Sequence, residues 1–295
     1  MDILLTGGNG VLGRDLLPYL TDAGHSVAAV VRSSTPECAG NATRKGVSWI
    51  TGNLADPKIG CLLPKSIDAI VHFASRPIAS LDQYDRLIYD NILATWHLIR
   101  YAIDCGVKKF IYASTISVHG TVLTERLDEK TPIINPCLYG LTKHGGEKFL
   151  SSVASQLPSI ALRLPGVLGP NSHSRIWPRR VLSDALSNVD ISIYNPDTLF
   201  NIAIHIDDLG PFIVQLLQKE WQGAHAIPLG AESDLSVKET VEYIIKKTGS
   251  QSKIIVKDNK QKSFWIARTL ASDIFGFRSM PMKVMLDRMI EEIVH

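Results

Sequence analysis

A glycine-rich turn near the start of the chain constrains the fold more than any other feature. It reads Thr6-Gly7-Gly8-Asn9-Gly10-Val11-Leu12-Gly13 and follows the apolar run Ile3-Leu4-Leu5. Gly7 permits a tight turn, Gly10 lets a ligand approach the backbone, and Gly13 lets a helix pack closely on a strand. Apolar residues recur at helical intervals directly afterwards. The segment therefore predicts a strand, a tight turn and a helix in direct succession.

The rest of the first half repeats this alternation of strand and helix. Further strands are predicted at the continuous apolar runs 27–31, 69–74, 110–113 and 160–162, and the stretch 88–103 has helical spacing. Strands that are apolar throughout and separated by helices indicate a parallel sheet covered on both faces. We therefore predict an α/β fold with a doubly wound parallel sheet.

The composition of the sequence changes after Gly169-Pro170, where residues 169–180 are rich in Pro, Asn, Ser and Arg. We interpret this change as the start of a smaller, discontinuous lobe, with a segment around 205–218 returning to the main sheet. The predicted domains are 1–168 with 203–228, and 169–202 with 229–295.

Composition narrows the class of protein. Among 295 residues, 31 Lys and Arg face 29 Asp and Glu, a balance that argues against a nucleic-acid-binding protein. No apolar run approaches the roughly 18 residues of a membrane span, and Met1-Asp2 leads straight into the first strand, so we expect no signal peptide. The 4 cysteines and 9 histidines show no metal-ligand spacing, so we expect no metal, reduced thiols and a cytoplasmic location.

The predicted turn is suited to a dinucleotide. Unpaired N–H groups and the positive dipole end of the following helix attract phosphates, so we expect contacts from Gly7, Asn9, Gly10, Val11, Leu12 and Gly13. The next strand ends in Val30-Val31-Arg32, without the acid that holds the ribose 2′-OH of NAD. Arg32 can pair with a 2′-phosphate, which predicts NADP(H) as preferred cofactor and NAD(H) as a possible one. The alternative is that Arg32 is a surface arginine.

A candidate proton donor lies further along the chain. Tyr139 and Lys143 are four residues apart, hence on one helix face, but Tyr243 and Lys247 share this spacing. Tyr139 follows a predicted strand that ends in Ala113-Ser114-Thr115, whereas no such strand end precedes Tyr243. We therefore interpret Tyr139, Lys143 and Thr115 as catalytic, with the Lys143 ammonium lowering the pKa of Tyr139 and Thr115 holding the substrate oxygen.

Together these segments resemble the extended short-chain dehydrogenase/reductases, the NAD-dependent epimerase/dehydratase family. The resemblance covers nearly the whole chain and rests on segments 6–13, 52–56, 71–74, 114–120, 139–143, 163–170 and 205–209 with Asn91. It implies a Rossmann cofactor domain, the Thr115-Tyr139-Lys143 catalytic set, and an Asn91 that braces the catalytic helix through a backbone or water contact. It also implies cofactor contacts from Asn53, Leu54, Phe73, Ala74, Ser75, Asn91, Tyr139, Lys143, Pro165 and Val167.

Departures from the family pattern narrow the reaction. Dehydratases carry an Asp-Glu pair after the catalytic Thr, where this chain has Ile116 and Ser117, so we expect no dehydratase. Gly166 stands where many nucleotide-sugar epimerases have Asn, and Phe200-Asn201 where they often have Arg. Substrate phosphates could instead meet arginines of the smaller lobe, with solvent-facing side chains as the alternative: Arg175, Arg179, Arg180 and Arg268. His119 replaces a usual Tyr and is expected to pack or hydrogen-bond.

The sequence thus predicts an NAD(P)-dependent ketoreductase or 4-epimerase acting at a secondary hydroxyl or keto carbon, most readily of a nucleotide sugar. Two alternatives stay open: an NADPH-dependent carbonyl reductase of a non-nucleotide substrate, and an NADP-sensing protein without catalysis. The resemblance further implies a homodimer formed through the helices at 88–104 and 139–155.

Overall fold

The computed structural model describes residues 1–33, 44–76, 84–258 and 263–294. They divide into two compact units: unit 1 comprises 1–120, 135–163 and 213–227, and unit 2 comprises 121–134, 164–212 and 228–295. The units differ from the sequence-derived boundaries in that segments 121–134, 164–168 and 203–212 group with the smaller unit.

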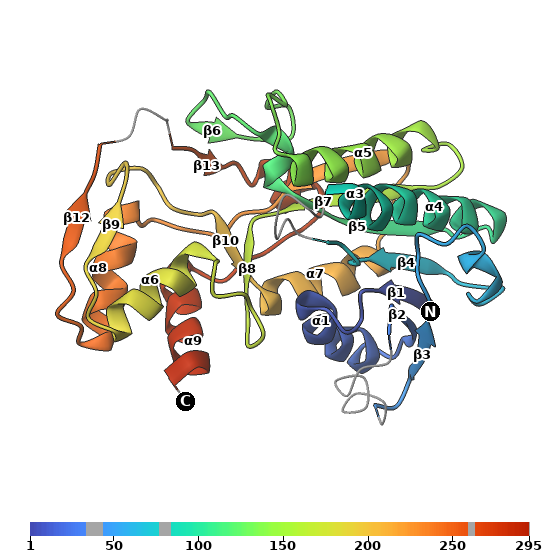
Figure 1. Cartoon of the computed structure of the whole chain (residues 1–295), viewed down its shortest axis with the longest axis horizontal. Coiled ribbons are helices and arrows are strands. Elements are labelled where there is room, and N and C mark those ends of the chain that lie inside the picture. The colour runs from blue at the N-terminus through green and yellow to red at the C-terminus, as the bar shows by residue number, and fades with distance from the viewer. Residues whose placement is uncertain (34–43, 77–83, 259–262, 295) are drawn as a thin grey trace. The chain divides into compact units, whose positions relative to one another are not determined.

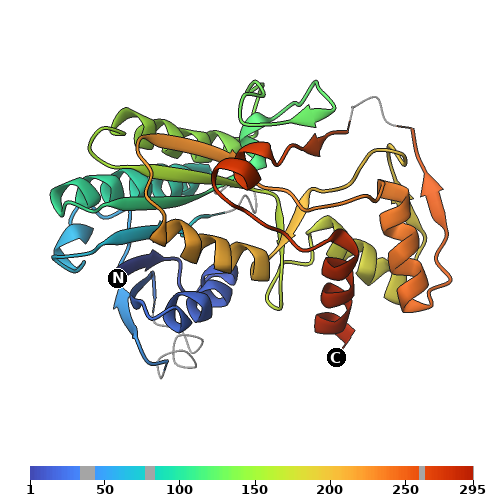
Figure 2. The same cartoon turned by 180° about the vertical axis from the view of Figure 1, so that it is seen from behind.

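Unit 1 is built on a seven-stranded sheet of order β11-β7-β5-β4-β1-β2-β3, in which β3, β2, β1, β4 and β5 pair in parallel. Helices α4 and α5 cover one face, while α1 lies on the other (Figure 1, and from behind in Figure 2). The predicted doubly wound α/β fold is confirmed. Its elements are β1 Asp2–Thr6, α1 Val11–Asp22, β2 Ser26–Val31, β3 Val47–Thr51, η1 Ile59–Cys61, β4 Ala69–His72, α3 Tyr84–Leu87, η3 Ile88–Leu93, α4 Ala94–Asp104, β5 Lys109–Thr115, η4 Ile116–His119, α5 Leu138–Ser152, β7 Ser159–Leu164 and β11 Ala224–Pro228.

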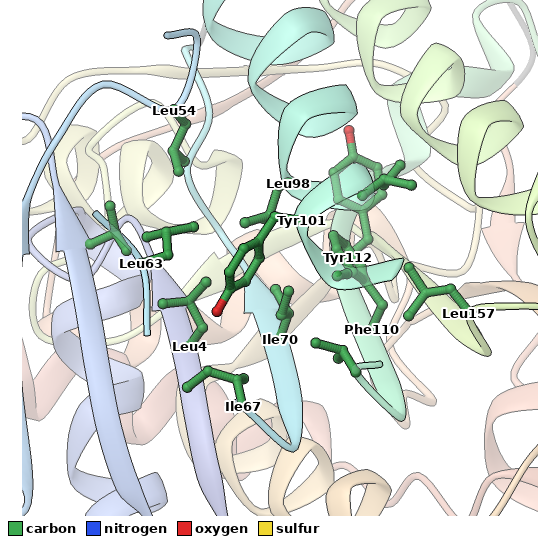
Figure 3. Close-up of a cluster of buried hydrophobic side chains, with 14 of the residues drawn as sticks. Leu4, Leu54, Leu63, Ile67, Ile70, Leu98, Tyr101, Phe110, Tyr112 and Leu157 are labelled. Carbon is green, nitrogen blue, oxygen red and sulfur yellow. The ribbon is translucent and has the colours of Figure 1, made fainter. Parts of the chain in front are cut away.

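The central strands are apolar because both faces of the sheet are covered. Every residue of β4, β5 and β7 is buried. On the α4 and α5 side, Leu4, Ile70 and Phe110 from neighbouring strands meet Leu98 and Leu157 in one cluster (Figure 3). Burial of such side chains is worth about 1.5–3 kcal/mol each, so the packing holds the carboxyl ends of the strands at one rigid edge.

The helix predicted over 88–103 begins differently from the expectation. Residues Ile88–Leu93 form a single π-helical turn, η3, and only then does the regular helix α4 begin. A π-turn inside a helix changes the angular spacing of its side chains and is frequent at functional sites. Here it carries Asp90 and Asn91, two consecutive residues that both contact the loop after β4.

Unit 2 contains small parallel strand pairs and its own apolar core, to which α6, α8 and α9 contribute side chains. Helix α8 begins with a capping box between Ser236 and Glu239, and Gly249 in the left-handed conformation ends it. The elements are β6 Arg126–Leu127, β8 Gly166–Leu168, α6 Trp177–Leu186, β9 Ile191–Ile193, β10 Ala203–His205, α7 Ile206–Gln218 (which passes into unit 1), α8 Val237–Thr248, β12 Ile254–Val256, β13 Trp265–Ile266, η5 Leu270–Ile274 and α9 Met282–Val294. None of the helices in the described part of the chain has the length and apolar character that a membrane crossing requires.

Candidate active site

The glycine turn connects β1 to α1 and leaves no room for a side chain at Gly7 or Gly13. Gly7 has φ +75°, and a Cβ on it would lie 2.8 Å from the backbone nitrogen of Ala74. The Gly10 N–H donates to the Gly7 carbonyl at 2.8 Å, and a Cβ on Gly13 would lie 2.0 Å from that same oxygen. Only glycine fits such contacts, so the turn is compact and the N-terminus of α1 stays open to a phosphate group.

A cavity of about 480 Å³ opens beside this turn. Its lining includes the ends of β2 and β4 as well as the turn, which is where an open parallel sheet binds nucleotides. Of the predicted cofactor contacts, those that line it are Gly7, Asn9, Gly10, Val11, Leu12, Gly13, Arg32, Asn53, Leu54, Phe73, Ala74 and Ser75. Pro165 and Val167 belong to unit 2, where Val167 lies buried in β8.

Two charged side chains meet in the wall of this cavity. Arg32 donates through Nη1 to Oδ2 of Asp90 at 2.8 Å, and Nε of Arg76 donates to the same oxygen. The Arg32 side chain is 56% exposed and the Asp90 side chain 17% exposed. Arg32 therefore does not face the cavity as an isolated cation, because a carboxylate shares its charge.

Asn91 connects the loop after β4 to helix α5. Its Oδ1 accepts from the Arg76 backbone N–H at 2.7 Å and from the Ser75 hydroxyl at 3.4 Å. Its Nδ2 donates to the Thr142 hydroxyl at 3.1 Å, and that hydroxyl donates to the Tyr139 carbonyl. The expected brace thus runs through a side chain of α5, between Tyr139 and Lys143, rather than through backbone or water.

Tyr139 lies in the first turn of α5, next to the cavity wall. Burial raises the pKa of its phenol, and a hydrogen bond with Ser75, which lines the cavity, acts in the opposite direction. The sequence argument expected the phenolate to be favoured by Lys143, whereas burial outweighs every other influence on this group. Tyr139 accordingly stays protonated at neutral pH, as a proton donor to a carbonyl oxygen must.

Lys143 is buried one turn further along α5, with 1% of its surface exposed. Burial lowers its pKa to about 7, and the Glu147 carboxylate partly offsets this. Its Nζ lies 4.2 Å from the ring centroid of Tyr112, a cation–π contact. Burial therefore disfavours the ammonium form of Lys143 on which the sequence argument relied.

Thr115 ends β5 and begins the turn that follows. Its hydroxyl accepts from the Ser117 backbone N–H at 3.2 Å and caps the short helix η4. Because the Thr115 side chain is 9% exposed, most of its surface is packed and its orientation is set by this cap.

A buried ion pair ties α5 to the strand ends beside it. Glu147 accepts two hydrogen bonds from Arg163, at 3.0 and 2.9 Å, and one from the Ser114 hydroxyl at 2.6 Å. The Arg163 guanidinium also contacts Nε2 of His119 at 3.1 Å, so His119 hydrogen-bonds as expected. These contacts hold the pKa of Glu147 below its usual value although burial opposes this.

The second Tyr–Lys pair has a different environment. Lys247 is 45% exposed and forms an ion pair with Asp287 at 2.8 Å, and the Tyr243 hydroxyl donates to the same carboxylate. This cluster joins α8 to α9 within unit 2. The predicted packing or surface role of Tyr243 fits these contacts.

The four arginines proposed for substrate all lie in unit 2. Arg175 and Arg180 are exposed, whereas Arg179 donates to the Ser172 carbonyl and hydroxyl at 2.6 Å. Arg268 donates to the Ser279 hydroxyl at 3.0 Å and lies 3.7 Å from Glu232. Arg175 and Arg180 are therefore the two whose guanidinium groups the structure leaves at the surface.

The departures at Gly166 and at Phe200-Asn201 also have structural correlates. Asn201 is buried and exchanges two hydrogen bonds, both 2.8 Å, with the backbone of Ile266. A Cβ on Gly166 would lie 2.6 Å from a methyl group of Ile176. Neither position is thus available as built for a contact to a substrate phosphate.

The model of the NAD dependent epimerase/dehydratase family matches residues 3–230, which include the glycine turn and the Tyr139-Lys143 helix. The chain belongs to this family. Among the residues that the structure describes, no group of three or more His, Cys, Asp or Glu side chains could hold a metal ion.

Members with different reactions are similar to this chain. A UDP-glucose 4-epimerase of Halalkalibacterium halodurans is 26% identical, over 84% of this chain and 81% of its own. A dTDP-D-glucose 4,6-dehydratase of Mus musculus is also 26% identical, over 85% of this chain and 74% of its own. The UDP-glucuronic acid 4-epimerase of Bacillus cereus, solved in complex with UDP-glucuronic acid and NAD, superposes with a TM-score of 0.83 at 20% identity over 100% of this chain and 99% of its own.

Several residues of the site carried no signal in the sequence. Asp90 and Arg76 meet Arg32 only in the folded sheet, since 58 residues separate Arg32 from Asp90. Glu147 could have been noticed, because it lies four residues after Lys143 on the same helix face. Its partner Arg163 lies in a different strand and could not be paired with it by spacing.

Proposed function

We propose that this protein is an NAD(P)-dependent oxidoreductase or epimerase that acts at a secondary hydroxyl or keto carbon of a nucleotide-activated sugar. One observation carries the proposal: the partly buried phenol of Tyr139, whose pKa burial raises, has a hydrogen bond with Ser75 in the wall of the glycine-turn cavity. A proton donor therefore adjoins the place where a dinucleotide would bind.

The cavity suits a dinucleotide because the glycines let the turn fold tightly against the backbone of Ala74 and Gly7 while they line the cavity themselves. The glycine turn and α1 would hold the pyrophosphate, with Asn53, Leu54 and Phe73 around the remaining groups. When bound, the cofactor supplies hydride transfer. The absence of an acid after β2 and the presence of Arg32 support NADP(H) as the preferred form, with NAD(H), the form in the Bacillus cereus complex, also accepted.

The chain's own residues would handle the proton. Tyr139 donates its hydroxyl proton to the substrate oxygen during reduction, and Thr115 positions that oxygen. Lys143, with a pKa of about 7, can release or take up a proton near Tyr139 as the phenol gives up its own. Asn91 fixes the intervening turn of α5 through Thr142.

A ketoreductase or 4-epimerase is favoured over a dehydratase. Ile116 and Ser117 follow Thr115, and neither side chain is an acid or base at neutral pH that could help to expel water from a sugar. The similarity to UDP-sugar epimerases supports a nucleotide sugar as substrate, and Arg175 and Arg180 are the proposed contacts for its phosphates. The engaged Asn201 and crowded Gly166 favour, as second candidate, a carbonyl reductase of a non-nucleotide substrate.

The assembly and location are part of the same proposal. Ile88, Tyr89 and Trp96 are exposed on η3 and α4, and Leu141 is exposed on α5. Such apolar side chains on the helices at 88–104 and 139–155 support a homodimer through these helices. We expect the protein in the cytoplasm, where its isolated cysteines stay reduced.

The test is turnover by Tyr139→Phe. With UDP-glucose, UDP-galactose, UDP-glucuronic acid and dTDP-4-keto sugars, we expect the variant to lose about 10²–10⁴-fold in kcat and to bind NADP⁺ as the wild type does. Tyr243→Phe, which changes the other Tyr–Lys pair, should keep wild-type turnover. The assignment would be contradicted if Tyr139→Phe kept the wild-type kcat on every substrate that the wild type turns over. It would also be contradicted if Tyr139→Phe lost cofactor binding while its kcat stayed unchanged. If the wild type binds cofactor but turns over no substrate, whether sugar nucleotide or simple ketone, the NADP-sensing alternative holds.

A further inference from the structure

The ion pair between Arg32 and Asp90 has a position that bears on the choice of cofactor. Arg32 directly follows β2, at the point where dinucleotide sites distinguish a ribose 2′-OH from a 2′-phosphate. Asp90 lies in η3, in the segment that follows β4. Since β1 lies between β2 and β4 in the sheet, the pair joins the two sides of the cavity across the glycine turn.

Asp90 is held more firmly than Arg32. Its side chain is 17% exposed against 56% for Arg32, and Arg76 donates to the same oxygen, Oδ2. The neighbouring Asn91 exchanges two hydrogen bonds with the backbone of Arg76, which fixes the point from which this second arginine extends. The carboxylate is therefore anchored in the cavity wall by two arginines, and Arg32 is the more exposed partner of the pair.

We propose that Asp90 is a specificity-determining residue of the dinucleotide site: it competes with a 2′-phosphate for the Arg32 guanidinium and so lets the protein accept NAD(H) beside NADP(H). A 2′-phosphate must share Arg32 with this carboxylate and lies within reach of its repulsion. A 2′-hydroxyl carries no charge and meets neither effect. The inference rests on the proposed dinucleotide function and deepens it.

The charge balance of the three side chains agrees with this role. Two guanidinium groups converge on one carboxylate oxygen, which leaves a net charge of one positive unit among Arg32, Arg76 and Asp90. A phosphate dianion would be attracted to such a group, but less than to two unpaired arginines. Removal of the Asp90 charge should therefore strengthen binding of the 2′-phosphate in particular.

The experiment measures dissociation constants by isothermal titration calorimetry of the full chain with NADP⁺, NAD⁺, 2′,5′-ADP and 5′-AMP. The last two isolate the 2′-phosphate from the rest of the cofactor. In Asp90→Asn, we expect NADP⁺ and 2′,5′-ADP to bind about tenfold more tightly, as one nearby unit charge at the surface implies. NAD⁺ and 5′-AMP should change by less than about twofold.

Two further variants make the result specific. Most of the gain should vanish when Asp90→Asn is combined with Arg32→Gln, because the freed guanidinium is its source. Asp22→Asn removes the carboxylate of another ion pair of unit 1, 2.6 Å from Arg44, whose aspartate is not among the cavity-lining residues. This control should leave all four dissociation constants unchanged, and thermal melting of each variant shows that it is folded.

The outcomes separate the two proposals. The role of Asp90 is overturned if the ratio of NADP⁺ to NAD⁺ dissociation constants in Asp90→Asn stays within about twofold of the wild-type ratio. It is also overturned if the double variant with Arg32→Gln keeps the full gain in NADP⁺ affinity. If the wild type binds a dinucleotide in these cases, the proposed function stands and this inference alone fails. If the wild type binds neither NADP⁺ nor NAD⁺, both are wrong.

Discussion

The buried pair of Glu147 and Arg163 yields a quantitative prediction for stability. Each side chain is 7% exposed, and the carboxylate accepts from Arg163 twice, from Ser114 and from His144. In Glu147→Gln, the amide NH₂ faces a guanidinium N–H, donor against donor, and Arg163 is left charged and buried. Breaking a buried pair in this way costs about 3–5 kcal/mol, so we expect unit 1 to lose about that much free energy of unfolding.

Urea denaturation followed by tryptophan fluorescence measures this loss. Trp96 reports on the relevant unit, since its ring lies 5.4 Å from Phe149 of α5. The matched control is Glu242→Gln, in an ion pair with Lys238 whose side chains are 51% and 50% exposed. The control should change the unfolding free energy by less than about 0.5 kcal/mol. A loss below about 1 kcal/mol in Glu147→Gln would refute the argument that burial makes this pair costly to break.

The pH dependence of the same variant checks the cause. The pKa of Glu147 is lowered in the folded protein, so its carboxylate contributes stability that is present above its unfolded pKa of about 4.3. That stability is lost as the pH falls through the lower folded pKa. The difference between wild type and Glu147→Gln should therefore shrink below about pH 4.3. A difference that stays constant at acid pH would show that packing, and not charge, accounts for the loss.

Two other substitutions test the glycine turn and the buried lysine. Gly13→Ala places a Cβ 2.0 Å from the Gly7 carbonyl oxygen, and we expect it to abolish NADP⁺ binding in calorimetry. The control Gly60→Ala, whose Cβ would lie 3.9 Å from its nearest neighbour, should bind NADP⁺ as the wild type does. Normal NADP⁺ binding by Gly13→Ala would contradict the packing argument. Lys143→Met removes an amine whose pKa is lowered to about 7 in the folded protein. Above that pH the folded wild type binds fewer protons than the unfolded chain. Its stability therefore increases as the pH rises towards about 10.4, the pKa of an unfolded lysine. The variant should lack this rise and should be more stable at pH 7 by up to about 4 kcal/mol; a lower melting temperature than wild type at pH 7 would be inconsistent with this.

Features that depend on neighbouring residues could be predicted well. The strands β1, β2, β4, β5 and β7 are continuous apolar runs, and the parallel sheet follows from their alternation with helices. The short strand β3 was not predicted, because Val47–Thr51 is only partly buried and alternates with polar residues. The π-turn at Ile88–Leu93 was also missed, since its apolar spacing resembles that of an ordinary helix.

Electrostatic environments were less accessible to sequence reasoning. Spacing brought Lys143 within reach of Tyr139, but it could not show that Lys143 would be buried against the ring of Tyr112. Burial lowers the pKa of Lys143 to about 7, and the burial of Tyr139 itself raises the pKa of the phenol, against the expected direction. Likewise, the identical spacing of Tyr243 and Lys247 leads to an exposed ion pair with Asp287. Solvent exposure distinguishes the two pairs, and exposure is a property of the packed molecule.

The sequence by itself determined the glycine turn, the class of fold and the identity of the candidate proton donor, because these follow from glycine positions, apolar runs and the order of segments along the chain. The tertiary structure decided which charges meet. Arg32 alone predicts a site for a 2′-phosphate, yet the sheet order brings Asp90 and Arg76 to it from a segment 44–58 residues away in sequence. Coulomb interactions depend on distance in space and on burial, so the charge that a cofactor meets at this position could be known only after the fold.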